Sequence, residues 1–249
     1  LSDRIRVMYD NISKFIADNF SKDLVEWILG EREEFTQLEP KELQLAPIRA
    51  DSVILLKSKE KIVHIEFQTL PKKEIPLRMV DYYLRLYRVY TEKDIYQVVI
   101  YLTKTQSPLA WQTKCELPQL KHEYHVIRLW EVPTEELLKS KGLLPFAVLS
   151  KTDNPEKVLE RVAQEIEKVR DEEEKSNLAA ASGVLAGLVL DKITINKLLR
   201  EEIMKESVIY QEIYATGETK GRREGEIKGR REGEIKGRRE GEANLVIRL

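Results

Sequence analysis

Two runs of branched apolar residues on either side of a short polar segment constrain the fold of this chain most. Residues 49–57 and 61–69 are rich in Ile, Val and Leu, and the polar tripeptide Ser58-Lys59-Glu60 separates them. Runs of this length and composition are typical of β-strands, and a short polar connection indicates that consecutive strands pair. The sequence therefore predicts a β-hairpin.

The second strand of this hairpin carries a polar face. Side chains alternate along a strand, so His64, Glu66 and Gln68 share one face, while residues 63, 65 and 67, which are Val, Ile and Phe, share the other. A carboxylate and an amide two residues apart on one strand face make this segment a candidate functional site.

The pairing of the two strands suggests what the polar face binds. If the hairpin turns at Ser58-Lys59, Asp51 lies opposite Glu66 and Lys57 lies opposite Glu60. Like charges so placed repel, and a divalent cation between them would relieve the repulsion. Carboxylates suit Mg²⁺ or Mn²⁺, which polarise phosphoryl oxygens and help to generate a hydroxide nucleophile, so the pair indicates phosphodiester hydrolysis.

Two alternatives stay open at this point. Two acidic residues near a hairpin are often ordinary surface charge, and charged residues make up 34% of this chain. Ser-Lys is also not a favoured two-residue turn, so a longer loop with a shifted register is compatible with the sequence.

Helical and strand patterns surround the hairpin. Apolar residues recur at helical spacing over 5–29, and Gly30 is a natural stop. A short strand is possible at 42–46. Pro76 opens an amphipathic helix in which residues 77, 80, 84 and 87 form an apolar stripe and Arg78, Tyr82 and Arg85 lie on another face. Residues 96–103 and 124–130 are predicted strands of the same sheet. The fold class is α/β, a mixed central sheet flanked by helices.

The C-terminal part has a different character. The pair Asn154-Pro155 predicts a helix start, and helices are expected over 156–169, 175–190 and 194–214, with a turn at residues 191–194. We expect a domain over 1–150, a helical region over 151–216 and a tail over 217–249. From 217 to 241 a glycine recurs at every fourth position within a repeat of the form KGRREGEI. Since glycine weakens helices, the alternatives for the tail are a flexible extension, a helix that forms only on self-association, and a phosphate-binding segment.

The order of these features resembles a known superfamily. A helix, an Asp on a strand, a turn, then Glu-x-Gln on the next strand, an amphipathic helix and a further strand are similar to the PD-(D/E)XK nucleases. Within that superfamily the chain resembles the recombination-promoting nuclease and transposase-like family, over roughly residues 3–150 and in its glycine-rich tail. The resemblance implies a restriction-endonuclease-like fold and a DNA endonuclease that uses Mg²⁺ or Mn²⁺ in recombination or transposition.

The resemblance also implies roles for individual residues. Asp51 and Glu66 would bind the metal ion, and Gln68 would take the place of the lysine that orients water. Arg78 and Tyr82 would face the DNA phosphate.

The chain departs from the superfamily pattern at two positions. Ala50 replaces a proline, and the neutral Gln68 cannot stabilise negative charge as an ammonium does. Lysines at 57, 72 and 73 are candidates to substitute for the missing charge. Acids at 10, 31 and 34 are candidates for a third carboxylate. His64 would either contact a phosphate or serve as a hydrogen-bonded histidine within the sheet.

Composition bounds the partners. With 42 basic and 43 acidic residues the net charge is −1, so no global basic field indicates a nucleic-acid partner, and any such surface must be local. One cysteine, Cys115, excludes an internal disulfide and favours a cytoplasmic location, and no membrane association is expected. The alternative function is a catalytically silent nucleic-acid-binding or self-assembly protein that keeps the fold. It would form a homo-oligomer through its C-terminal helices and tail.

Overall fold

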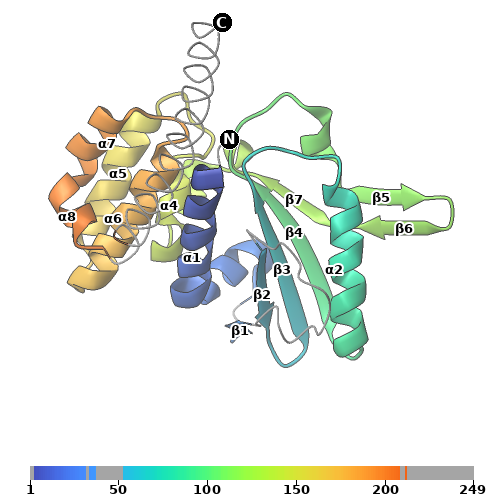
Figure 1. Cartoon of the computed structure of the whole chain (residues 1–249). Helices are drawn as coiled ribbons and strands as arrows, with labels where there is room; N and C mark the ends of the chain where they lie inside the picture. The colour runs from blue at the N-terminus through green and yellow to red at the C-terminus, as the bar shows by residue number, and fades with distance from the viewer. Residues whose placement is uncertain (1–2, 32–33, 38–52, 208–210, 212–249) are drawn as a thin grey trace, which may run out of the picture. The chain divides into compact units, whose positions relative to one another are not determined.

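A five-stranded mixed sheet forms the centre of the protein (Figure 1). The computed structural model describes residues 3–31, 34–37, 53–207 and 211. The strand order is β1-β2-β3-β4-β7. The strands are β1 (Thr36–Gln37), β2 (Val53–Lys57), β3 (Lys61–Gln68), β4 (Asp94–Tyr101) and β7 (His125–Arg128). The predicted class, a mixed sheet with helices followed by a helical C-terminal region, is confirmed.

The direction of the strands places their carboxyl ends along one edge. The β1–β2 and β2–β3 pairs are antiparallel, whereas β3–β4 and β4–β7 are parallel. In the parallel part, Gln68 pairs with Tyr101, and Tyr101 pairs with Arg128. The last residues of three strands are therefore neighbours, and in open α/β sheets such edges commonly carry ligand sites.

The hairpin forms as predicted, but its register differs. Val53, not Asp51, pairs with Glu66, and Lys57 pairs with Ile62, not Glu60. The reason lies in the turn, whose central residues are Lys59 and Glu60. Ser58 precedes these two residues. Its hydroxyl accepts hydrogen bonds from the backbone N–H groups of Glu60 and Lys61, at 3.3 and 3.0 Å, and these bonds stabilise the turn at this position. Moving the turn by one residue shifts the register by two.

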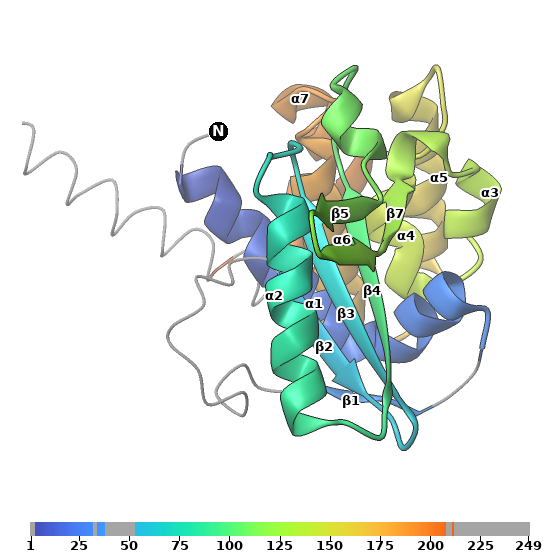
Figure 2. The same cartoon turned by 90° about the vertical axis from the view of Figure 1, so that its right-hand side faces the viewer.

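The two faces of the sheet are covered by different layers. Helix α1 (Asp3–Leu29) and the C-terminal helices cover one face, and α2 (Ile75–Val89) covers the other (Figure 2). Helix α1 ends as predicted at Gly30, whose φ of +72° suits glycine. Val63, Ile65 and Phe67 of β3 point into the main core beneath α1.

Helix α2 turns a different side to the sheet than its apolar stripe suggests. The apolar residues 77, 84 and 87 are exposed, whereas Ile75, Met79, Tyr82 and Leu86 are buried. The physical reason is the sheet face below, which presents the polar side chains of β3. Arg78 and Tyr82 lie on the helix side that meets them.

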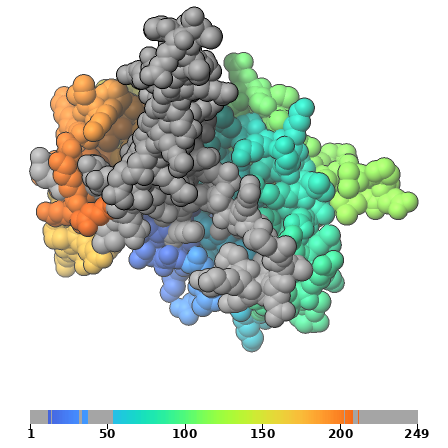
Figure 3. Space-filling view, viewed as in Figure 1, coloured from blue at the N-terminus to red at the C-terminus, as the bar shows by residue number. Residues whose placement is uncertain are grey.

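A second, two-stranded sheet has no counterpart among the expected elements. Strands β5 (Lys114–Leu117) and β6 (Leu120–Glu123) pair antiparallel and project from the molecule beside α2 (Figure 3). Their side chains are mostly exposed and charged, so the sequence lacks the apolar alternation by which strands are predicted. The possible strand at 42–46 lies outside the described residues.

The helices after the sheet depart from prediction in two places. Helix α5 (Pro155–Glu167) starts as expected, with the side chain of Asn154 accepting from Lys157 N. Helix α6 (Glu172–Ala186) begins and ends earlier than expected. The predicted helix 194–214 divides into α7 (Lys192–Leu199) and α8 (Glu201–Lys205), because Arg200 has a φ of +52° that no α-helix accommodates.

These helices share one hydrophobic core with the sheet. The cluster that contains Ile65 and Phe67 also contains Leu159 of α5, Leu178 of α6 and Leu199 of α7. Two short helices, α3 (Thr134–Leu137) and α4 (Leu144–Ala147), lie between the sheet and α5 in the chain. The domain boundaries at 150 and 216 stay predictions, and the tail is outside the described residues. No helix of the described part is long and apolar enough to span a membrane.

A glycine at the contact between α1 and the short helix η4 (Lys141–Leu143) provides a test of this packing. The backbone N–H of Gly142 donates to Asp23 Oδ2 at 2.8 Å, and a Cβ at this position would lie 2.8 Å from Cγ of Phe20. We expect Gly142→Ala to lower the free energy of unfolding by about 1–3 kcal/mol, because overpacking forces the backbones apart. Urea denaturation measures the change. The exposed Lys139→Ala is the control, with an expected change within about 0.5 kcal/mol. Equal stability of both variants would contradict the close contact.

Candidate active site: a buried polar cluster beneath helix α2

A cluster of polar side chains is buried between α2 and the sheet. Two small apolar clusters occupy the same layer: one includes Ile75, Met79 and Val99, and the other includes Ile62 and Leu86. Between them along β3, β4 and α2 come polar side chains that are almost inaccessible to solvent. These are His64, Glu66 and Gln68 of β3, Gln97 of β4 and Tyr82 of α2. We refer to these five residues, with Arg78 and His122, as the polar cluster.

Glu66 is the charged centre of the polar cluster. Its side chain has no solvent exposure, and its Oε1 lies 2.5 Å from Nη2 of Arg78 and 2.8 Å from Nε2 of Gln68, which donates to it. Its second oxygen, Oε2, is buried and has no hydrogen-bond partner in the described part of the chain. One carboxylate oxygen is therefore held by two donors while the other is available.

Opposing effects act on the ionisation of this carboxyl group. Burial raises the pKa of Glu66 above its ordinary value, because the charged form loses its hydration. The charge of Arg78, its hydrogen bond, the hydrogen bond from Gln68 and the charge of Lys72 all act to lower the pKa again. Arg78 is thus the main group that favours the charged form of this buried glutamate.

A hydrogen-bonded chain of side chains runs beside Glu66. Nε2 of Gln97 lies 2.7 Å from Nδ1 of His64 and donates to the carbonyl oxygen of Met79 at 2.9 Å. Oε1 of Gln97 lies 2.6 Å from Nε2 of His122, on β6. Burial first, then the charge of Arg78, lowers the pKa of His64 to about 3, so its ring is neutral at ordinary pH. Burial also lowers the pKa of His122.

Aromatic rings pack around this chain. Tyr82 lies against His64, with 4.5 Å between ring centroids, and Tyr83 lies against His122 at 4.9 Å. The Tyr82 hydroxyl is buried with no hydrogen-bond partner among the described residues, and burial together with nearby Glu66 raises its pKa. Burial likewise raises the pKa of Tyr101, the neighbour of Gln68 on β4, to about 12. Both hydroxyls therefore stay protonated.

The structure brings together four of the five predicted site residues. Glu66, Gln68, Arg78 and Tyr82 belong to the polar cluster. Tyr82 is only 1% exposed, so its ring packs within the layer. Asp51, the second predicted metal ligand, lies outside the described residues.

The candidates for supporting roles fall in different places. Lys72 acts electrostatically on Glu66, whereas the ammonium of Lys57 lies over the ring of Tyr90. Glu31 pairs with Lys61, at the opposite end of β3 from Glu66, and Glu34 pairs with Lys22. Neither acid therefore joins the polar cluster. The side chain of Asp10 lies outside the described part.

Arg78 connects the polar cluster to the surface. Its side chain is 26% exposed and lines a hollow of about 520 Å³ on the outer side of α2. The other lining residues are Glu74, Leu77, Val80, Asp81 and Leu84. One side chain therefore both pairs with the buried Glu66 and lines a hollow at the surface.

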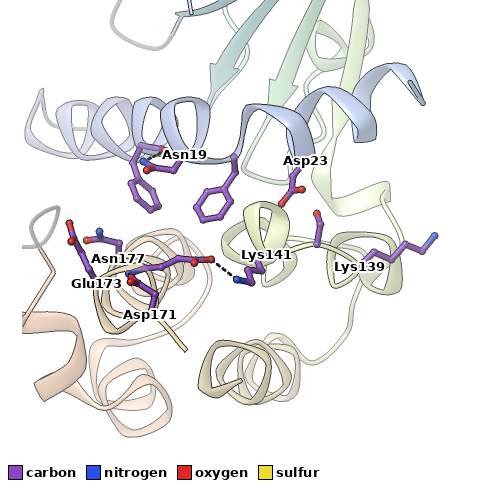
Figure 4. Close-up of a pocket in the computed structure, with 11 residues that line it drawn as sticks. Asn19, Asp23, Lys139, Lys141, Asp171, Glu173 and Asn177 are labelled. Carbon is purple, nitrogen blue, oxygen red and sulfur yellow. Dashed lines mark hydrogen bonds and ion pairs between the residues drawn. The ribbon is translucent and has the colours of Figure 1, made fainter. Parts of the chain in front are cut away.

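A cavity larger than the hollow on α2 lies elsewhere, between α1 and the N-terminal end of α6 (Figure 4). It has a volume of about 750 Å³, and none of the polar cluster lines it. Its polar groups already serve the fold: Lys141 Nζ donates to Glu174 at 2.9 Å, Asp171 caps α6, and Asn177 accepts from Ser207 Oγ. We therefore place the candidate site at the polar cluster.

Gln97 and His122 are members that the sequence did not reveal as site residues. Gln97 is a single amide within the otherwise apolar run YQVVIYLT, and that isolated polar residue is the signal that could have drawn attention to it. His122 lies on a strand without apolar alternation, so no pattern placed it near the sheet. Among the residues the structure describes, no group of three or more His, Cys, Asp or Glu side chains is arranged to hold a metal ion.

The ion pair between Arg78 and Glu66 gives a pH-dependent prediction. Because the folded-state pKa of Glu66 is raised, its contribution to stability is full below the ordinary glutamate pKa and is lost as the pH rises through the folded value. Arg78→Met raises that pKa further. We expect the variant to lose about 3 kcal/mol at pH 7.5 and distinctly less at pH 4, measured by urea denaturation.

The matched control is Arg85→Met on the same helix. Arg85 pairs with Asp81, whose side chain is 52% exposed, so its loss should cost less than about 1 kcal/mol. Equal losses for Arg78→Met at the two pH values would refute the role of Arg78 as the counter-charge of Glu66.

Comparison with known proteins gives no match to any family model, to any curated protein or to any solved structure. The assignment of a function therefore rests on the residues of the polar cluster.

Proposed function

We propose that the protein is a metal-dependent DNA endonuclease whose active site contains Glu66. The observation that carries this proposal is the state of its carboxylate, which is fully buried, with Oε1 held by Arg78 and Gln68 and Oε2 without a partner in the described chain. Burying a charge is costly, and ionisable groups with perturbed pKa values cluster at functional sites. A structural ion pair alone would not explain an oxygen left available.

The oxygen of Glu66 is a ligand of the kind that Mg²⁺ and Mn²⁺ prefer, and it is the one proposed ligand that lies within the described residues. Both ions prefer hard oxygen ligands, and Mg²⁺ commonly uses one or two carboxylates while keeping water and phosphate oxygens. Glu66 Oε2 is such an oxygen, and Asp51 would be the second ligand. When bound, the ion would polarise a phosphoryl oxygen and lower the pKa of a bound water.

The remaining roles belong to the side chains around Glu66. Gln68 fixes the carboxylate through its 2.8 Å hydrogen bond and would orient a water molecule with its other polar groups. Arg78 reaches from Glu66 to the hollow on α2, so its guanidinium would hold a DNA phosphate there. Lys72, whose charge already acts on Glu66, would supply the positive charge that Gln68 lacks.

Tyr82 has a different role in this proposal from the one that the family resemblance implies. Because its ring is buried against His64, it supports the layer and does not contact a phosphate. The resemblance to PD-(D/E)XK nucleases of the recombination-promoting type agrees with the order of Glu66, Gln68 and Arg78 along the chain. A role in recombination or transposition is part of the same proposal.

Plasmid nicking tests the endonuclease directly. We expect the full chain to nick supercoiled DNA with Mg²⁺ or Mn²⁺. Glu66→Gln and Asp51→Asn should each lower the rate by at least about 100-fold, because a coordinated metal ion lowers the activation barrier by several kcal/mol. Circular dichroism checks that the variants fold. The control is Glu160→Gln, an exposed acid on α5, which should nick at the parental rate. Nicking that persists in both site variants would refute the proposal.

Gln68→Lys tests the role of the amide. A lysine here can still donate a hydrogen bond to Glu66 Oε1, and it adds a charge beside the reacting phosphate. We expect nicking to increase by about 10-fold or more over the parent at saturating Mg²⁺. Unchanged or lower activity in a folded variant would contradict the water-orienting role of this position.

A second candidate function is a catalytically silent binding or assembly protein with the same fold. The observation that favours it is that Arg78 already neutralises Glu66, which a structural ion pair would also do. The nicking assay separates the two functions. Absence of nicking by the parent and by Gln68→Lys would favour the silent protein.

A further inference from the structure

The side-chain amide of Gln97 lies at a junction of three hydrogen bonds. Its Nε2 contacts the Met79 carbonyl oxygen at 2.9 Å and His64 Nδ1 at 2.7 Å, and its Oε1 contacts His122 Nε2 at 2.6 Å. Gln97 is 3% exposed and His64 is fully buried. The directions of these bonds are fixed by chemistry alone.

The Met79 carbonyl oxygen fixes the orientation of the Gln97 amide, and the proton positions on His64 and His122 follow from that orientation. A carbonyl oxygen only accepts, so the amide group that faces Met79 must be the NH₂. Its second hydrogen then points to His64 Nδ1, which must be the lone-pair nitrogen. The neutral ring of His64 therefore carries its proton on Nε2. At the other end, Gln97 Oε1 only accepts, so His122 donates from Nε2.

The protonated nitrogen of His64 faces Glu66. His64 Nε2 lies 3.9 Å from Glu66 Oε2, and neither atom has another partner among the described residues. An N–H group directed at a carboxylate oxygen is attractive, whereas the other tautomer would direct a lone pair at it. The proton position thus matters for the same oxygen that the proposed function assigns to the metal ion.

We propose that Gln97 and His122 are positioning residues that hold His64 as an N–H donor toward Glu66 Oε2. Gln97 sets the tautomer, and His122 occupies the amide oxygen so that the amide cannot rotate. The role at the metal site rests on the proposed function, whereas the tautomer does not. The chain also connects the projecting β5–β6 hairpin, through His122, to the buried carboxylate.

This arrangement excludes His64 as a metal ligand through Nε2. A protonated ring nitrogen has no lone pair for coordination, so the described ligand on this side is the carboxylate oxygen alone. Oxygen ligands without imidazole or thiolate favour Mg²⁺ and Mn²⁺ over Zn²⁺. The hydrogen bonds from His122 through Gln97 to His64 would therefore also contribute to the choice of metal ion.

Nuclear magnetic resonance of the full chain labelled with ¹⁵N-histidine tests the tautomer. The chain has three histidines, and His122→Gln and His125→Gln assign the signals by difference. We expect His64 to carry its proton on Nε2 in the unmodified protein at pH 7.5. In Gln97→Glu the new carboxylate accepts but cannot donate, so the proton should move to Nδ1. A proton on Nδ1 in the unmodified protein would overturn the proposal.

A second variant covers a failure of Gln97→Glu to fold. Gln97→Met has a similar length and offers no hydrogen bond to His64, so we expect the ¹⁵N resonance of His64 Nδ1 to move toward that of a nitrogen with a free lone pair. The control is the exposed Gln112→Glu, which should leave the His64 signals unchanged. An unshifted His64 Nδ1 resonance in folded Gln97→Met would overturn the role of Gln97.

Mn²⁺ binding, measured by electron paramagnetic resonance, tests the positioning role separately. We expect the Kd for Mn²⁺ to rise by about 10-fold or more in Gln97→Met, and not in Gln112→Glu, as is usual when a group that orients a metal ligand is lost. An unchanged Kd alongside a shifted His64 Nδ1 resonance would overturn the positioning role. Absence of Mn²⁺ binding by the unmodified protein would overturn both the metal site and the positioning role of Gln97 and His122. The nuclear magnetic resonance measurement would still decide whether Gln97 sets the tautomer of His64.

Discussion

Strand β3 is covered by protein on both faces, and most of the arrangement around it follows from that. Seven of its eight residues are buried, so its alternating side chains enter two different layers. Val63, Ile65 and Phe67 join the main core with the helices of the other face. The opposite set is polar, and because buried polar groups require partners, α2 must meet it with Arg78 and not with its apolar stripe. The exposed leucines of α2 are a consequence of this requirement.

The polar cluster therefore satisfies most of the polar groups that this packing buries, but not all of them. Arg78 and Gln68 both contact Oε1 of Glu66, and Gln97 hydrogen-bonds to Nδ1 of His64. Among the described residues, four buried polar atoms of the cluster have no hydrogen-bond partner, and two of them, Glu66 Oε2 and His64 Nε2, lie 3.9 Å apart. A cluster needed only for stability would be expected to satisfy all its members, since half-satisfied buried networks are unfavourable. The unsatisfied pair is where a ligand would gain most.

Sequence patterns predicted the elements that bury a regular apolar set, namely α1, the hairpin, β4, β7 and α5. They did not predict β5 and β6, whose charged and exposed side chains carry no alternation, or the break at Arg200. The predicted register of the hairpin was wrong because the turn is centred on Lys59-Glu60, where the Ser58 hydroxyl accepts two backbone hydrogen bonds, and not on Ser58-Lys59. At the candidate site, alternation along β3 was enough to group Glu66 with Gln68. The partnership of Gln97 with His64 required the parallel pairing of β3 with β4, which is a tertiary fact without a local signal.

The lengths of the strands across the sheet have a consequence for how molecules of this protein behave toward one another. In the described part of the chain, the two eight-residue strands, β3 and β4, lie in the interior of the sheet, whereas the outer strands β1 and β7 have two and four residues. An outer strand with free backbone groups is a template on which another chain can add, and short outer strands offer few such groups. The two long strands, which offer the most backbone groups for intermolecular β-association, are thus kept inside the sheet, and the described outer strands are poor templates for aggregation.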